Sequence, residues 1–367
     1  PIKEWEKDIV VNSQFPYFNV QRYGIIDDGQ TDNTLLLQNL INLAPDKSVL
    51  FFPVYIKNSH YVFSNTLTIN HPLTLEGENK DSMIYFNIPN EVKNGFNISS
   101  DFVEIKNMRI TAEINRGGKG IYYHNNTRDI AYSRFIDLTV DGFNEGIHLK
   151  NCFYIDIDNN LIRDSKTGVL VENCTTTLNI RKTYVLRCDI GYKLTTCLYG
   201  SLDTCACDHA SLNAYALSDC GSFNVLNCGS EVVQKTHMVV SGCKGLNIDG
   251  YTVVNTKTGS DFASMLAIAN YSNISVSGLR EIENDNANGY SVLVDQFSLL
   301  FIQSSSVKRK FEPSGYTVGS IETVDGHLIF DGMYKKFFGL KPDKRIIYQI
   351  GDRYINKSVS HAKLIGE

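Results

Sequence analysis

The chain of 367 residues lacks several features that would assign it to a familiar class of protein. No apolar run approaches the roughly 20 residues of a transmembrane helix, and the opening PIKEWEKDIV is not a basic and then apolar leader. We therefore expect no membrane insertion and no signal peptide in this chain. Lysines and arginines are scattered and the net charge is −5, so the sequence has no basic footprint for nucleic acid.

Sequence signatures of several enzyme classes are absent too. There is no Gly-rich phosphate loop, GxSxG elbow or HExxH motif, which argues against nucleotide, serine-hydrolase and zincin chemistry. The nine cysteines include one CxC pair, Cys205 and Cys207, but no CxxC or His pair at ligand spacing, so we expect no metal site. No helical period persists beyond the first 45 residues.

A repeat of 22 or 23 residues is what the sequence does contain. Segments such as TGVLVENC and NAYALSDC each end in one of five cysteines: Cys152, Cys174, Cys197, Cys220 and Cys243. Six residues before these cysteines stand Gly146, Gly168, Gly191, Ala214 and His237. Such a period is typical of solenoids, and abundant Val, Ile, Tyr and Thr favour strands. The sequence therefore predicts an all-β parallel β-helix with coils of 22–28 residues and a buried column of thiols about 4.8 Å apart.

The chain divides into three parts by pattern. Residues 1–45 contain TDNTLLLQNLINLA at 31–44, an amphipathic segment with an N-capping Thr or Asp, which predicts a helix over the first coil. Its apolar residues are Leu35, Leu36, Leu40, Ile41 and Leu43. Residues 46–306 are expected to form the β-helix, and residues 307–367 a C-terminal cap or trimerisation region.

Three motifs carry a resemblance. The segment FNVQRYGIIDDGQTDNT, which starts at Phe18, resembles the opening signature of the pectate lyase-like superfamily of right-handed parallel β-helix proteins, although Ile25 and Asp27 depart from it. Residues 205–231 are similar to a two-coil segment of bacteriophage tailspikes, and GDRYINKS at 351–358 is similar to their closing motif. The resemblance implies a homotrimer, a place in a virion tail or secretion, and a bacterial surface polysaccharide as partner.

Stacked carboxylates are the chemistry that a β-helix can offer such a partner. Twelve residues before the five cysteines stand Val140, Ile162, Val185, Asp208 and Glu231. Asp208 and Glu231 should therefore share a register on adjacent coils, with carboxyl groups about 5–9 Å apart, a range that covers both retaining and inverting glycosidases. One would protonate the glycosidic oxygen and the other would act as base or nucleophile. The alternative is that both acids cap turns by accepting backbone N–H groups.

Further candidates lie near this pair. Asp164 and Asp189 could form a second carboxylate pair, and Arg163, Arg187 and Lys182 could hold an anionic sugar. His209 follows Asp208 and could contact sugar, as could Glu145 in DGFNEG. Exposed tyrosines could be stacking platforms for sugar rings, with Tyr184, Tyr199 and Tyr215 as the examples.

The preferred function from the sequence is a tailspike-type depolymerase that hydrolyses a surface polysaccharide with Asp208 and Glu231 and needs no cofactor. One alternative is a polysaccharide lyase that uses Lys182, Arg187 or His209, with Asp164 or Asp189 holding Ca²⁺ or the substrate. Another is a tail protein that binds glycan without cutting it.

Overall fold

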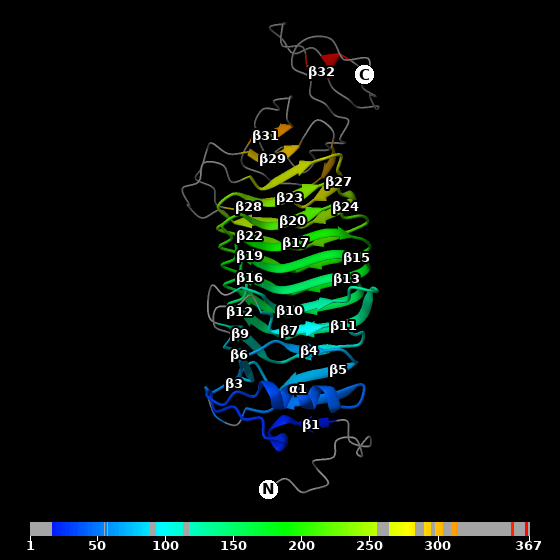
Figure 1. The fold of residues 1–367 in the computed structure, drawn as a ribbon. Coiled ribbons are helices and arrows are strands. Elements are labelled where there is room, and N and C mark those ends of the chain that lie inside the picture. Colours follow the sequence, from blue (N-terminus) through cyan, green and yellow to red (C-terminus); the bar gives the residue numbers. More distant parts are fainter. Residues whose placement is uncertain are drawn as a thin grey trace.

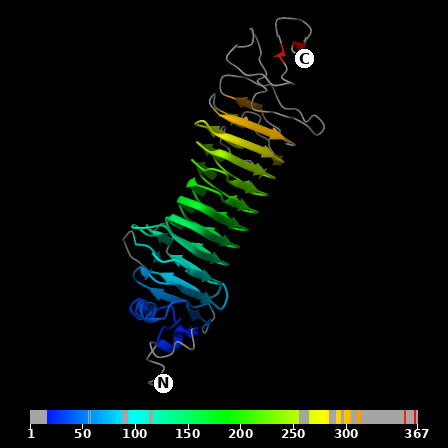
Figure 2. The same cartoon turned by 90° about the vertical axis from the view of Figure 1, so that its right-hand side faces the viewer.

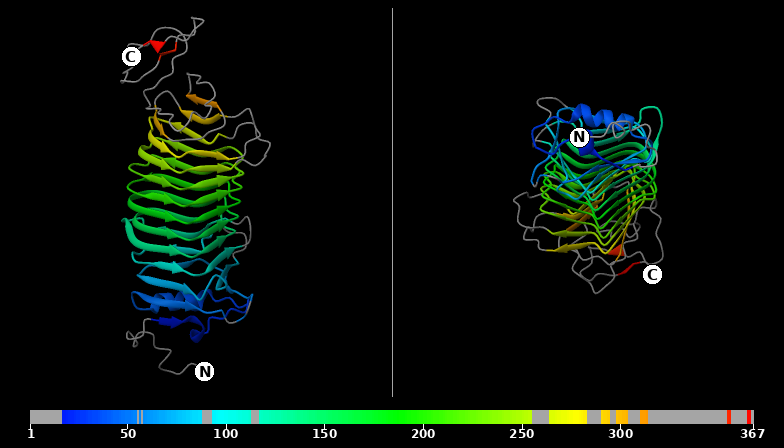
Figure 3. Two further views of the ribbon diagram at one scale, coloured as in Figure 1. Left: turned by 180° about the vertical axis from the view of Figure 1, so that it is seen from behind. Right: turned by 90° about the horizontal axis from the view of Figure 1, so that it is seen from below.

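The structure, a computed structural model, describes residues 17–54, 56, 58–87, 93–112, 117–254, 264–282, 290–294, 298–303, 310–313, 354–355 and 364–365. It is a right-handed parallel β-helix whose coils stack along one axis (Figure 1), which confirms the fold expected from the sequence. Figure 2 shows the strands of successive coils lying in rows, and Figure 3 adds a view along the axis. No helix in the described residues is long and apolar enough to cross a membrane.

A ten-stranded parallel sheet forms one wall of the solenoid. Its strands are β3 (Tyr61–Phe63), β6 (Met83–Phe86), β9 (Arg109–Ala112), β12 (Thr139–Asp141), β14 (Leu161–Arg163), β16 (Tyr184–Leu186), β19 (Ala206–Asp208), β22 (Gly229–Glu231), β25 (Thr252–Val254) and β28 (Arg280–Ile282). In most of these strands the middle residue is buried and its neighbours are partly exposed. The outward residues of this wall therefore stand in rows that run along the axis.

A 21-stranded parallel sheet forms the remaining walls. Its first row contains β4 (Leu67–Ile69), β7 (Phe96–Ile98), β10 (Lys119–His124), β13 (Glu145–Asp158), β15 (Thr167–Arg181), β17 (Ile190–Cys197), β20 (Asn213–Ser218), β23 (Thr236–Ser241), β26 (Leu266–Ala269), β29 (Tyr290–Val294) and β31 (Lys310–Pro313). Its second row contains β1 (Tyr17–Asn19), β2 (Ser48–Phe52), β5 (Leu73–Gly77), β8 (Glu104–Lys106), β11 (Ile130–Ile136), β18 (Ser201–Asp203), β21 (Asn224–Leu226), β24 (Lys244–Asp249), β27 (Asn273–Ser277) and β30 (Leu299–Gln303). The long strands β13 and β15 pass through both rows.

The interior contains the predicted cysteine column. Cys152 pairs in register with Cys174, and Cys174 with Cys197. All nine cysteines are free and buried, so the prediction of stacked core thiols without disulfides is confirmed. Small apolar thiols let successive coils approach at strand spacing.

Corners between the walls are built from left-handed residues. The corner after the ten-stranded sheet contains Asp164, Arg187, His209 and Val232, with φ of 55°, 53°, 56° and 52°. Each donates its backbone N–H to a carbonyl on the next coil, at 3.1, 3.0, 2.9 and 3.4 Å. These hydrogen bonds offset the cost of the left-handed conformation and fix the direction of each corner side chain.

Helix α1 (Thr34–Leu43) packs against β4 at the N-terminal end of the solenoid, as the sequence predicted. Asp32 Oδ1 accepts a hydrogen bond from the Thr34 N–H at 3.0 Å and so satisfies one of the free backbone donors in the first turn of the helix. The predicted apolar face was partly wrong: Leu37, Leu40 and Ile41 are buried, whereas Leu35, Leu36 and Leu43 are exposed. The buried residues form a narrow stripe on the helix, which packs against β4 and the turn Val20–Tyr23.

At the C-terminal end β32 (Tyr354–Ile355) pairs antiparallel with β33 (Leu364–Ile365). Most of the predicted C-terminal region, residues 307–367, and most of the GDRYINKS motif lie outside the described residues. Their assignment as a cap or trimerisation region therefore stays a prediction.

Candidate functional site

Asp208 and Glu231 are register neighbours. Asp208 ends β19, Glu231 ends β22, and the two residues are paired across these parallel strands. The prediction that they share a register is confirmed. Counting twelve residues back from the upstream cysteines gave the wrong positions, because Val140, Ile162 and Val185 point into the core. The row of outward residues that contains Asp208 and Glu231 continues upstream through Leu186, Arg163 and Asp141.

Tyr184 is the polar neighbour of this pair. Its hydroxyl, at the start of β16 on the preceding coil, donates to Asp208 Oδ2 at 2.6 Å. Burial, the hydrogen bond to Asp208, and the charges of Asp208 and Glu231 together raise the pKa of Tyr184. The phenol therefore stays protonated and is a donor to Asp208 over the physiological pH range.

The two acids do not cap turns with their side chains. Their backbone carbonyls accept the N–H groups of Arg187 and His209, at 3.0 and 2.9 Å. No backbone N–H of a described residue donates to either carboxyl group. Within the described part of the chain, no lysine or arginine lies within 4.0 Å of either carboxylate, in contrast to Asp141, Asp164 and Glu145. The expectation that both side chains cap turns is therefore not met by the hydrogen bonds of the described residues.

Small residues accompany the acids on the same wall. The first residues of β19 and β22 are Ala206 and Gly229, which lie in register between Tyr184 and Thr252. A Cβ added to Gly229 would meet only the Thr252 carbonyl oxygen, at 3.3 Å. Two positions before each acid on its strand the wall therefore carries at most a methyl group, while Leu186 and Val254 flank the acids in their own row.

Two buried tyrosines support the strands that carry the acids. The Tyr215 hydroxyl lies 2.8 Å from the carbonyl oxygens of both Cys205 and Gly229, and the Tyr192 hydroxyl lies 3.2 Å from that of Ala206 in β19. Their rings stack with centroids 5.0 Å apart. The prediction of Tyr215 as an exposed sugar platform was wrong, because this residue is 0% exposed.

The second predicted carboxylate pair does not form. Arg187 donates to both Asp164 carboxyl oxygens at 2.7 Å, and this hydrogen bond and charge lower the pKa of Asp164. Asp189 instead lies in a turn, where its carboxylate accepts the Ser211 hydroxyl. No described contact joins Asp164 to Asp189. Within the described residues no group of three or more His, Cys, Asp or Glu side chains could hold a metal ion.

A series of ion pairs occupies the outward residues of the coils that precede Asp208. Asp141 accepts from Arg109 at 3.0 Å and from Arg163 at 3.4 Å, and it is buried. Arg163 lies 3.9 Å from Asp164, which completes a chain of alternating charge up to Arg187. These arginines are therefore already neutralised, and the coil beside Asp208 presents Leu186 rather than a charge.

Lys182 and His209 are both exposed corner residues. Lys182 precedes β16 and has φ of 45°, so it stands at the opposite end of that strand from Arg187. His209 directly follows Asp208 at the end of β19, beside the acids. Of these two residues, His209 is the one that lies beside the carboxylate pair.

Glu145 belongs to a different wall. His148 contacts Glu145 through Nδ1 at 2.7 Å and Glu172 through Nε2 at 2.9 Å. Both ring nitrogens of His148 are therefore engaged by carboxyl groups of this wall. Burial would raise the pKa of Glu145, but the hydrogen bond and charge of His148 and the charge of Lys119 lower it below its usual range. Glu145 therefore does not join the Asp208 site.

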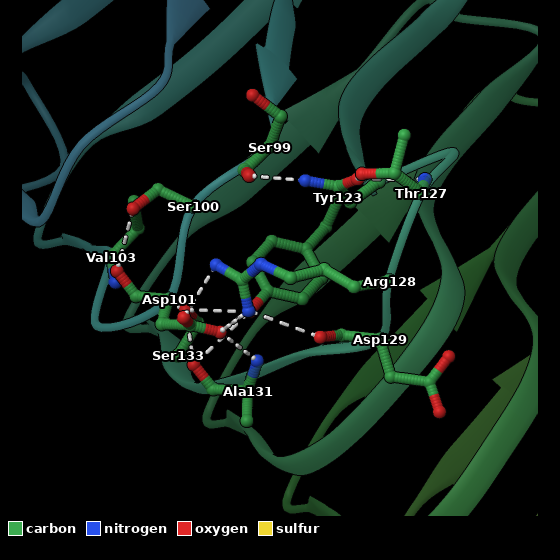
Figure 4. Close-up of polar contacts among 11 residues, drawn as sticks. Ser99, Ser100, Asp101, Val103, Tyr123, Thr127, Arg128, Asp129, Ala131 and Ser133 are labelled. Atoms are coloured by element: carbon green, nitrogen blue, oxygen red, sulfur yellow. Dashed lines mark hydrogen bonds and ion pairs between the residues drawn. The ribbon is translucent and has the colours of Figure 1, made fainter.

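Exposed aromatic rings gather at another corner. Phe102, Tyr132 and Tyr154 are 52%, 49% and 48% exposed and stack at centroid distances of 5.0 and 5.1 Å. Figure 4 shows how this corner is anchored, with Arg128 bound to Asp101 and the Asp101 carboxylate accepting the Ala131 N–H at 2.7 Å. Tyr199, expected near the acids, is 64% exposed but at this corner.

The fold and its outward rows define the class, a right-handed parallel β-helix, and solved structures of bacteriophage tailspikes are similar to it. No protein-family model and no curated protein matches this chain.

Solved structures similar to the chain include three phage proteins. Geobacillus virus E2 ORF18 matches with a TM-score of 0.53 and 18% identity over 80% of this chain and 62% of that one. The enzymatically active domain of bacteriophage CBA120 tailspike protein 2 gives 0.59 and 12% over 76% and 47%, and the Acinetobacter phage vb_AbaP_AS12 gp42 tailspike gives 0.58 and 10% over 96% and 64%. The chain thus spans less than two thirds of each, and the likeness establishes the fold.

Proposed function

We propose that this chain is a polysaccharide depolymerase that hydrolyses a bacterial surface glycan, such as a capsule, an O-antigen or a teichoic acid. The observation that carries the proposal is the pairing of Asp208 with Glu231 at one register on adjacent coils, without a basic partner among the described residues. Two such carboxylates are what glycoside hydrolysis requires.

The surroundings of the pair suit a chain-like substrate. Ala206 and Gly229 are small residues at the start of the two strands that carry the acids, and Tyr184 and His209 supply a donor and an exposed imidazole nearby. A glycan lying across the strands could place a glycosidic oxygen against one acid and its anomeric carbon against the other. The likeness to tailspikes supports a homotrimer in a virion tail as part of the same proposal.

Elimination is the second candidate, and the ion pairs argue against it. A lyase must bind a uronic acid carboxylate and abstract the neighbouring proton with a free base. Arg187, one of the expected lyase residues, is bound to Asp164 through two hydrogen bonds of 2.7 Å. Lys182 lies at the far end of β16. A protein that binds glycan without cleavage is the third outcome of the test.

The test is incubation with purified capsular, O-antigen and teichoic-acid glycans, followed by mass spectrometry of the products. Hydrolysis gives fragments heavier by one water per cut, which is the expected result. Fragments that lack this water and absorb in the ultraviolet would identify a lyase. Intact glycan that nevertheless co-sediments with the protein would identify a binding protein.

A further inference from the structure

We infer that Tyr184 fixes the division of labour between the two acids: Asp208 acts as the ionised base or nucleophile and Glu231 as the proton donor. This inference rests on the proposed function and assigns roles within the same site. Tyr184 is a positioning residue in this scheme, because it touches Asp208 and acts through it.

The direction of one hydrogen bond sets the roles. The Tyr184 hydroxyl donates to Asp208 Oδ2 at 2.6 Å, a length typical of a charge-assisted bond to an ionised carboxylate. Such a donor stabilises the charged form of the carboxyl group that accepts from it. Asp208 also lies one coil closer to Tyr184 than Glu231 does, since the register runs from β16 through β19 to β22.

Glu231 has the complementary environment. No hydrogen-bond donor among the described residues reaches its carboxyl group. Its neighbour across β22 and β25 in the row is Val254, and on the other side stands Asp208. Glu231 therefore lacks the donor that Asp208 has, and it is the member of the pair placed to give a proton to the glycosidic oxygen.

The reaction balances with these roles. Glu231 gives its proton to the glycosidic oxygen as the bond between that oxygen and the anomeric carbon breaks. In a single displacement, Asp208 takes a proton from the water whose oxygen attacks the anomeric carbon. In a double displacement, Asp208 itself bonds to that carbon, and water then cleaves the ester while ionised Glu231 takes the water proton. One water is consumed per cut in either course.

The first test follows the two protons directly. Protein labelled with carbon-13 at its Asp and Glu carboxyl groups is titrated downward from neutral pH by NMR, and the two signals are assigned from their loss in Asp208→Asn and Glu231→Gln. We expect Glu231 to take up its proton before Asp208, and Tyr184→Phe to move the Asp208 step upward by about one pH unit. Protonation of Asp208 first would overturn the inference.

The second test uses whichever glycan of the panel is cleaved. Tyr184→Phe should move the acidic limb of the kcat profile upward by about one pH unit and leave the alkaline limb in place. Movement of the alkaline limb alone would make Asp208 the acid and contradict the assignment.

Tyr122→Phe is the matched control, since Tyr122 is a partly buried tyrosine whose pKa is raised by burial and by the charges of Glu172 and Glu145 on another wall. It should leave both the carboxyl titrations and the kcat profile unchanged. If no glycan is cleaved, the proposed function fails while the NMR titration still decides the order of protonation, so the two failures are distinguishable.

Discussion

Tyr215→Phe removes one buried hydroxyl from behind the acid pair and changes little else. The phenyl ring can keep its place against Tyr192, whose ring is parallel to it within 6°. The lost hydroxyl lies 2.8 Å from the carbonyl oxygens of Cys205 and Gly229 on two successive coils. Loss of a buried donor of this kind costs roughly 1–3 kcal/mol in free energy of unfolding, or a few degrees of melting temperature.

The assay is urea unfolding followed by circular dichroism, together with kcat on the cleaved glycan. Cys205 directly precedes β19 and Gly229 begins β22, so we expect Tyr215→Phe to lower kcat as well as stability. The control is Tyr61→Phe near the N-terminal end, where a tyrosine 1% exposed donates to the Pro53 carbonyl at 2.6 Å. It should destabilise the fold and spare kcat. An unchanged free energy of unfolding in Tyr215→Phe would refute the reasoning.

Three further results are expected. In Gly191→Ala the new Cβ would lie 2.4 Å from Cys207 Sγ, so this variant should lose about 1–3 kcal/mol in its free energy of unfolding, measured in urea. Gly229→Ala should lose clearly less, and equal losses in the two variants would contradict the crowding at Gly191. Burial raises the pKa of the Cys207 thiol, and all nine cysteines are buried, so a thiol reagent should modify the protein only after unfolding, and rapid native labelling would contradict the cysteine column. The Arg187 hydrogen bond lowers the pKa of Asp164 in the folded protein, so the ionised Asp164 stabilises the fold above the unfolded pKa of 3.8 and this stabilisation should be lost as the pH falls below 3.8. Asp164→Asn should therefore reduce the loss of stability in acid, and an unchanged dependence of stability on pH would refute this reasoning.

The solenoid was readable from the sequence because its period is a direct consequence of coil length. Cysteines recur wherever a small apolar residue fits the core, and this regularity alone placed Asp208 and Glu231 in one register. The upstream count failed by one residue because the cysteines are spaced by 22, 23, 23 and 23 residues, whereas the register from Val140 to Ser230 in the ten-stranded sheet is spaced by 22, 23, 22 and 23. Cysteine and acid rows therefore do not keep a constant offset from coil to coil.

The position of Tyr215 in the repeat also predicts its burial, although the abundance of tyrosine suggested a stacking platform for sugar rings. Five residues before Cys220 stands Tyr215, and five before the preceding cysteines stand Ile147, Val169 and Tyr192, all buried. Tyr192 was not predicted to support the site because its place in the repeat was not used to assign its face. Register decides which face a tyrosine takes, and it outweighs residue type.

Contacts between side chains at the corners could not be predicted. The bond from Arg187 to Asp164 depends on two left-handed residues that aim their side chains at each other, and the bond from Tyr184 to Asp208 depends on rotamers. A repeat fixes backbone register but not these directions. For that reason the sequence offered four catalytic carboxylates, and the structure was needed to separate the ion-paired Asp164 from Asp208 and Glu231.

The most direct test of the account is cleavage by matched carboxylate variants. Asp249→Asn is the control, because Asp249 on β24 accepts a Ser277 hydroxyl at 2.6 Å much as Asp208 accepts Tyr184. On the glycan that the protein cleaves, Asp208→Asn and Glu231→Gln should each keep fold and binding and lose kcat by about a thousandfold or more, while Asp249→Asn keeps it. Normal kcat in either site variant would contradict the assignment of the acid pair.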